Sequence, residues 1–288
     1  MNVVLHCRFL CFLLLVCSIP SFTSCQLLGS PNMPKSYMLP RPKKIILPKK
    51  LNETSALFYL QNENAMITVA DNKQKIYRIT QDGEVNDYFK EDFGPEEDYE
   101  DVVKMDSTVY VLISNGTIVE VKPNSDGLQV NKYPIWLQGK NDFETLYYDP
   151  ESKGLIMLCK NCADERGKGV RTAYRFDLTG KQFETKPFYT ISSKAVQNSL
   201  KDGKVDFEPS AAAIHPLEKR LYILASAGNL LVVANLKGQV EEAYRLNPTL
   251  YPQSEGIAFA PNGDMYITNE AKLGKPTLLF IPYKPAGK

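Results

Sequence analysis

The chain has 288 residues, 43% of them apolar, and its 34 basic and 33 acidic residues nearly cancel at neutral pH. This balance excludes a strongly basic nucleic-acid binder, so we expect no nucleic-acid partner. The length and apolar content suffice for one all-β domain with an ample core.

The first 24 residues predict a lipoprotein signal peptide. Arg8 precedes an apolar run over residues 9–16, and small residues lead to Cys25. The run is too short to remain as a membrane span. Residues 22–25, Phe-Thr-Ser-Cys, resemble a bacterial lipoprotein box, which makes Cys25 the candidate lipidation site. The alternative is an exported protein without a lipid that is cleaved near Cys25.

Residues 25–42 are rich in proline, serine, asparagine and basic residues and show no periodicity, so they predict a tether. With the signal, the tether indicates a lipid-anchored protein of the bacterial cell envelope that reaches the membrane through its anchor alone. The residues after Cys25 contain no acidic run, which favours a periplasm-facing position over the cell surface.

A glutamate followed by an apolar run recurs five times in the remaining chain, residues 43–288. The glutamates are Glu53, Glu100, Glu144, Glu208 and Glu255, at spacings of 47, 44, 64 and 47 residues. A period in this range predicts stacked or radially arranged units. In each of the first four units a turn between the third and fourth strands ends in glycine, at Gly83, Gly127, Gly180 and Gly238, which supplies the positive φ that a tight hairpin needs.

Apolar alternation divides each of the first four units into four strands. These strands are expected at 56–60, 66–70, 75–80 and 84–89; 102–105, 109–113, 117–121 and 128–134; 146–148, 155–159, 173–178 and 183–189; and 211–214, 221–225, 230–236 and 240–246. The fifth unit has three, at 257–260, 264–268 and 277–283. An N-terminal strand at 43–48 supplies its fourth, which predicts a closed five-bladed β-propeller. Residues 190–206 form an insertion, expected as a loop with one helical turn on the glutamate face.

Each glutamate is expected at the start of an innermost strand, so all five converge on the central channel. At about 8 Å and an effective dielectric near 20, each neighbouring pair costs on the order of 2 kcal/mol. A cation, hydrogen bonds from the next blade, or protonation must relieve this repulsion. Oxygen ligands in a loose ring favour Ca²⁺ over Mg²⁺. The candidate ligands are a subset of Glu53, Glu100, Glu144, Glu208, Glu255, Asp71, Asn269 and Glu270. A structural latch between blades and a catalytic carboxylate set remain alternatives.

Two further features concern cysteine and histidine. Cys159 and Cys162 are the candidate disulfide of an exported protein, with a redox pair as the alternative, and a zinc site lacks the other ligands. His215 is the one histidine left after removal of the signal. Its turn lies on the face opposite the glutamates, so a general base and a Ser-His-Asp triad are not supported.

The Glu-Xaa-apolar-apolar units, the segment Gln-Ser-Glu-Gly-Ile-Ala-Phe at 253–259 and Leu-Cys-Lys-Asn-Cys at 158–162 together resemble the SdiA-regulated family of bacterial β-propellers. The similarity covers residues 43–283. It implies a five-bladed propeller distantly similar to NHL-repeat proteins, a calcium ion as in a family member, and no settled activity.

The resulting hypothesis is an exported, monomeric, calcium-binding recognition module. Its partner at the glutamate face is a small molecule or another envelope protein. The alternative is a calcium-dependent hydrolase of the phosphodiesterase or esterase and lactonase type that uses the same glutamates.

Overall fold

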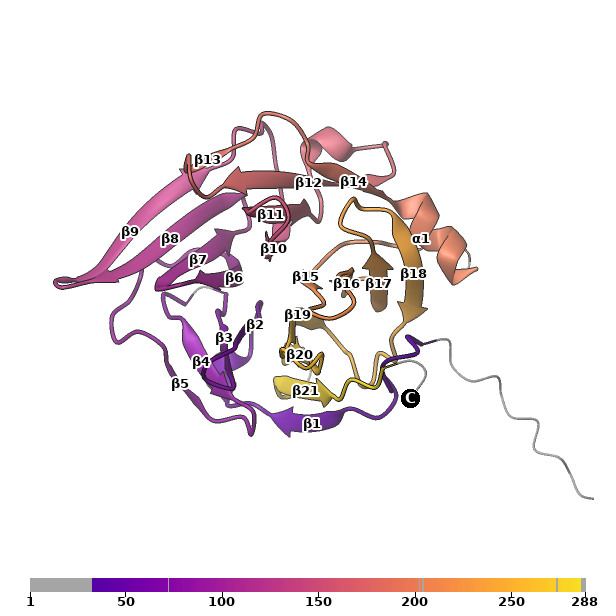
Figure 1. Cartoon of the computed structure of the whole chain (residues 1–288), viewed down its shortest axis with the longest axis horizontal. Helices are drawn as coiled ribbons and strands as arrows, with labels where there is room; N and C mark the ends of the chain where they lie inside the picture. The colour runs from indigo at the N-terminus through magenta and orange to yellow at the C-terminus, as the bar shows by residue number, and fades with distance from the viewer. Residues whose placement is uncertain (1–32, 72, 202, 204, 273, 286–288) are drawn as a thin grey trace, which may run out of the picture. The chain divides into compact units, whose positions relative to one another are not determined.

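A computed structural model describes residues 33–71, 73–201, 203, 205–272 and 274–285. In residues 33–285, five antiparallel sheets are arranged around a central axis (Figure 1). The predicted five-bladed β-propeller is confirmed.

Each blade runs from an innermost to an outermost strand. Blade 1 consists of β2 (Phe58–Leu60), β3 (Ala65–Thr68), β4 (Tyr77–Thr80) and β5 (Val85–Asp87). Blade 2 consists of β6 (Tyr99–Met105), β7 (Thr108–Ile113), β8 (Thr117–Asn124) and β9 (Gly127–Pro134). Blade 3 consists of β10 (Phe143–Asp149), β11 (Gly154–Cys159), β12 (Val170–Asp177), β13 (Gln182–Phe183) and β14 (Tyr189–Ser192). Blade 4 consists of β15 (Ala211–Ile214), β16 (Leu221–Ala225), β17 (Leu230–Ala234) and β18 (Val240–Arg245). Blade 5 consists of β19 (Ser254–Phe259), β20 (Met265–Asn269), β21 (Thr277–Ile281) and β1 (Lys43–Ile46).

The core lies between neighbouring blades rather than at the centre of the ring. Every residue of β11 and β16 is buried, because both faces of a middle strand pack against adjacent sheets. Such strands are continuous apolar runs, whereas the outer strand β18 buries only Ala243 and Tyr244 of its six residues. Five apolar clusters fill the five gaps between blades.

The two ends of the ring are joined by β1, which pairs antiparallel with β21 from Lys43 opposite Phe280 to Ile46 opposite Thr277. The predicted closure of the last blade by an N-terminal strand is therefore confirmed. It covers the edge of β21, which would otherwise present unpaired backbone groups.

The packed unit begins before Lys43, within the stretch expected to be a tether. Tyr37 and Leu39 are buried in the cluster between blades 4 and 5. The Tyr37 hydroxyl donates to the carbonyl oxygen of Gly263 at 2.6 Å and lies 2.6 Å from Nε2 of His215. These bonds fasten the N-terminal segment to two blades.

His215 is a buried structural residue, as expected from its turn. Its Nδ1 accepts from the backbone N–H groups of Leu217 and Glu218 at 3.1 and 2.9 Å. The ring proton is therefore on Nε2, which donates to Tyr37. Burial lowers the pKa of His215 to about 4, so the ring is neutral.

The insertion after blade 3 differs from the expected loop on the glutamate face. Both β13 and β14 pair with β12, and α1 (Ser193–Leu200) follows, capped by the Ser192 hydroxyl. The helix packs against β18 at the outside of blade 4 (Figure 1), because Val196 is buried in the cluster between blades 3 and 4. In the described part of the chain, no helix has the length and apolar character to cross a membrane.

Replacing Tyr37 tests whether this segment belongs to the fold. Tyr37→Ala should lower the free energy of unfolding by about 3–5 kcal/mol, because it empties a packed site. Tyr37→Phe should cost about 1–3 kcal/mol, because it leaves Nε2 of His215 without its acceptor. Urea denaturation of the mature chain measures both.

The neighbouring Met38, 44% exposed, provides the control: Met38→Ala should change stability by no more than about 0.5 kcal/mol. Wild-type stability in both Tyr37 variants would show that the fold does not depend on the segment.

Candidate functional site

An acidic cavity of about 450 Å³ occupies one end of the central channel. All five predicted glutamates line it together with Asp71 and Glu270. The complete lining is Glu53, Ser55, Asp71, Glu100, Glu144, Lys160, Glu208, Ser226, Ala227, Asn229, Pro252, Gln253, Glu255, Glu270 and Lys272. Seven carboxylates thus share the cavity with two ammonium groups.

Three of the glutamates occupy the same position in their blades. The ladder between first and second strands shifts register at Glu100 in blade 2, at Glu144 in blade 3 and at Glu255 in blade 5. Each shift is a β-bulge, which turns the extra residue away from regular alternation. The bulge therefore directs these three side chains toward the channel.

Glu53 and Glu208 lie two residues earlier in their blades, where Ser55 and Ser210 hold the bulge position. The backbone shows this equivalence. The backbone N–H of Ser55 donates to the carbonyl oxygen of Val69, and that of Ser210 donates to the carbonyl oxygen of Leu224. In both blades an alanine follows the serine, Ala56 in blade 1 and Ala211 in blade 4. The N–H at the end of the second strand bonds to the carbonyl two residues before the bulge position, at Glu53, Asp98, Asp142 and Gln253 in blades 1, 2, 3 and 5.

The expectation of five equivalent glutamates is therefore wrong in register, although all five reach the cavity. They divide into two tiers. The bulge tier is Ser55, Glu100, Glu144, Ser210 and Glu255, and the upstream tier is Glu53, Asp98, Asp142, Glu208 and Gln253.

One group in the described residues brings three carboxylates from both tiers together. Single oxygen atoms of Glu100, Asp142 and Glu144 all lie within 4.8 Å of one another. Glu100 is 8% exposed, and no described residue donates a hydrogen bond to its carboxylate. Oε2 of Glu144 is buried and also unpaired. These oxygens are suited to a hard cation, and Asp142 was not among the predicted ligands.

Lys160 is the main counter-charge that the sequence analysis missed. Its backbone N–H donates to the carbonyl two residues before the bulge position, as those of Asp71 and Glu270 do in blades 1 and 5. This shared position is the signal that identifies it. Its Nζ pairs with Oε1 of Glu144. Burial lowers the pKa of Lys160, but the charge of Glu144 outweighs this and the net shift is upward.

Burial, together with neighbouring negative charges, raises the pKa of the cavity carboxyls. Burial and the charge of Glu144 raise the pKa of Glu100 to about 11. Burial raises the pKa of Glu144 to about 7 despite Lys160, and that of Glu270 to about 7. The pKa of Asp71 rises to about 6 through burial, and that of Glu255 rises well above its ordinary value for the same reason.

Asn269, one of the predicted ligands, does not line the cavity. Its amide donates to the Thr277 hydroxyl at 3.0 Å, and its Oδ1 accepts from Ser254 at 2.7 Å. The side chain is fully buried within blade 5. Asn269 therefore joins strands of its own blade and offers no oxygen to the channel.

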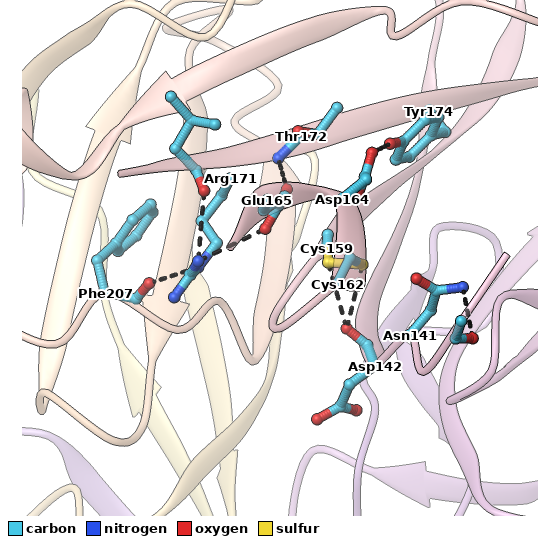
Figure 2. Close-up of a disulfide and its surroundings, with 12 residues drawn as sticks. Asn141, Asp142, Cys159, Cys162, Asp164, Glu165, Arg171, Thr172, Tyr174 and Phe207 are labelled. Carbon is cyan, nitrogen blue, oxygen red and sulfur yellow. Dashed lines mark hydrogen bonds and ion pairs between the residues drawn. A yellow bond between two sulfur atoms is a disulfide. The ribbon is translucent and has the colours of Figure 1, made fainter. Parts of the chain in front are cut away.

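A disulfide between Cys159 and Cys162 closes the loop that carries Lys160. Both sulfur atoms lie against the carbonyl oxygen of Asp142, at 3.6 and 3.9 Å, while the carboxylate of Asp142 points away from them (Figure 2). The backbone N–H groups of Lys160 and Asn161 donate to the same carbonyl at 2.9 and 3.1 Å. One small covalent ring thus positions Asp142 and Lys160 together.

Close backbone packing lies beneath the acidic cavity. A Cβ on Gly256 would lie 2.2 Å from Oγ1 of Thr268 and 2.7 Å from the backbone of Ala56, so the innermost strands of blades 5 and 1 touch there. A second cavity of about 630 Å³ lies along the later residues of the inner strands and contains Phe58, Tyr148 and Phe259. The two cavities share no lining residue.

Comparison with known proteins identifies the family of this chain. The profile of the family described as SdiA-regulated matches residues 35–274. The chain belongs to the SdiA-regulated family. No curated protein matches this member of the family.

Solved structures that resemble this family member share its fold at low identity. The Myxococcus xanthus glutaminyl cyclase has a TM-score of 0.56 at 12% identity, over 84% of this chain and 94% of its own. A glucose dehydrogenase has a TM-score of 0.53 at 12% identity, over 83% of this chain and 99% of its own. A luciferin-regenerating enzyme has a TM-score of 0.50 at 11% identity, over 84% and 95%. At these identities the likeness concerns the fold alone.

The raised carboxyl pKa values predict that stability falls with pH. In chelator, the folded state keeps protons on Glu144 and Glu270 near pH 6.5, whereas the unfolded chain, with glutamate pKa values of 4.5, has lost them. Raising the pH to 8.5 removes the folded-state protons, and this stabilisation is lost. The melting temperature should drop by roughly 4 °C or more.

His215 does not obscure this test, because its pKa is lowered and its effect changes below pH 6.5. Glu144→Gln should flatten the pH dependence, and Glu84→Gln, at an exposed position outside the cavity, should leave it unchanged. A melting temperature that rises over this range would contradict the electrostatic description of the cavity.

Proposed function

We propose that Ca²⁺ binds Glu100, Asp142 and Glu144 at the wall of the acidic cavity, where Glu100 and Glu144 belong to the lining and Asp142 lies beside them, and that the face around it recognises a ligand. Two observations carry the proposal: Glu144 has a buried, unpaired Oε2, and one of its carboxylate oxygens lies within 4.8 Å of oxygens of Glu100 and Asp142. Leaving a buried charged oxygen unpaired is costly, and a cation removes that cost. The ligand set is entirely oxygen, which Ca²⁺ prefers.

The bound ion would neutralise charge at the blade 2 and blade 3 side of the cavity. The rest of the lining, including Ser226, Asn229 and Gln253, offers hydrogen-bonding groups beside it. Since the cavity measures about 450 Å³, far more than the roughly 30 Å³ share of one water molecule, a small polar molecule or a side chain of an envelope protein fits next to the ion. This arrangement supports an ion-dependent recognition module.

The same free volume favours a second candidate, a calcium-dependent hydrolase of phosphodiesters or esters. An ion with open positions acts as a Lewis acid and lowers the pKa of bound water. Glu270 lies in the same lining and, with a pKa of about 7, is the candidate proton acceptor. We rank this activity second because no described histidine reaches the cavity.

Calcium titration tests the proposed site. At a concentration 100 times its Kd, Ca²⁺ should stabilise the chain by about 2.7 kcal/mol, with proton release because ligands titrate. Glu100→Gln combined with Glu144→Gln should abolish both effects, whereas Glu84→Gln should retain them. Calorimetry at pH 8 measures affinity, and thermal unfolding measures stabilisation.

Equal calcium affinity in the double variant and the wild type would refute the ligand assignment. The same proteins separate the two candidate functions. Turnover of chromogenic phosphodiesters or esters that needs Ca²⁺ and disappears in the double variant would establish the hydrolase. Calcium binding without turnover supports the recognition module.

We further propose that a lipid on Cys25 anchors the protein in the bacterial envelope, facing the periplasm. Cys25 and the signal over residues 1–24 lie outside the described residues, so the sequence alone supports this. In a bacterial host, wild-type protein should incorporate labelled fatty acid and sediment with membranes. Cys25→Ser should do neither, and labelling that persists in this variant would contradict the assignment.

A further inference from the structure

Lys160 stands inside the acidic cavity rather than at its rim, and it contacts a proposed calcium ligand. Its side chain is 24% exposed and that of its partner Glu144 is 12% exposed. The other cavity lysine, Lys272, is exposed and pairs with no carboxylate in the described residues. Of the two cavity lysines, Lys160 is therefore the one whose ammonium group is held against a carboxylate of the site.

The contact uses one carboxylate oxygen and leaves the other available. Nζ of Lys160 takes Oε1 of Glu144, while Oε2 remains buried and without a partner. An ion at Oε2 thus does not require the salt bridge to break. The salt bridge to Oε1 instead limits the rotation of the Glu144 carboxylate.

Lys160 is itself held firmly. Cys159 and Cys162 flank it in a disulfide loop, and its backbone N–H donates to the carbonyl of Asp142 at 2.9 Å. The loop that carries the ammonium therefore also orients Asp142. Two of the three carboxylates depend on this loop for their position.

The charges within this group have a simple balance. A bound cation would displace the proton that Glu100 otherwise keeps, and Glu100, Asp142 and Glu144 would then carry three negative charges. The ammonium of Lys160 would leave two. A single divalent ion matches that charge. Without the lysine, the group would match a trivalent ion.

We propose that Lys160 is a positioning residue that sets the valence selectivity of the cavity, matching it to one divalent cation by holding Oε1 of Glu144. This inference rests on the proposed calcium site. It assigns to Lys160 a role that a merely structural salt bridge would not have, namely control over the preference between ions of equal size and different charge.

The test compares Ca²⁺ with La³⁺, both measured by calorimetry at pH 8 on the mature chain. A unit charge at about 6 Å and an effective dielectric of ~20 changes binding by on the order of 100-fold per unit of ion charge. Allowing for solvent screening, Lys160→Met should raise the preference for La³⁺ over Ca²⁺ at least about tenfold. Lys160→Gln keeps a donor to Glu144 but no charge, and it should do the same.

Two control variants isolate the charge. Lys160→Arg keeps it and should leave the ratio of affinities within about threefold of wild type. Lys272→Met removes the exposed cavity lysine and should also change the ratio by less than about threefold, because solvent screens exposed charges.

The outcomes distinguish this inference from the site on which it rests. Calcium binding by the wild type with an unchanged ratio in folded Lys160→Met and Lys160→Gln would overturn the valence role alone. Absence of binding of either ion to the wild type would overturn the calcium site, and the role of Lys160 with it.

Discussion

Repulsion among carboxylates in a confined space is the constraint on which the functional end of this propeller depends. Seven carboxylates line one cavity with two lysines, and like charges interact more strongly there than in water. The fold can keep this arrangement only by protonating some carboxyls, pairing others or holding a cation. Each of these three responses has a counterpart in the structure. The pKa values of Glu100 and Glu255 are raised, Lys160 pairs with Glu144, and Oε2 of Glu144 is left unpaired where a cation could bind.

Much of the architecture could be predicted from the sequence because blades repeat. The glutamate period, the apolar alternation and the glycine turns together define five units, and the missing strand of the last unit identifies its N-terminal replacement, observed as β1. These are local signals that recur, so an error in one unit is corrected by the others. The insertion after blade 3 occurs once, and its placement on the outside of blade 4 depended on the burial of Val196, which no repeat could reveal.

The site was harder to predict because its geometry depends on register. Blades 1 and 4 place a glutamate two residues before a serine, whereas blades 2 and 3 place an aspartate two residues before a glutamate. Aligning the glutamates therefore hid the equivalence of Glu53 with Asp142, and with it one member of the three-carboxylate group. Lys160 was missed for another reason. The spacing of Cys159 and Cys162 around it predicts a disulfide, and it gives no indication of a buried counter-charge. Asn269 has a suitable oxygen, but a partner within blade 5 already uses it.

The contact at Gly256 lies where the chain passes from one cavity to the other, because Glu255 lines the acidic cavity and Ile257 lines the second one. The backbone of blade 1 approaches Gly256 so closely that even a methyl group is excluded. The two hollows share no lining residue. Substitutions among the aromatic residues of the second hollow can therefore change its chemistry without altering the set of charges around the acidic one.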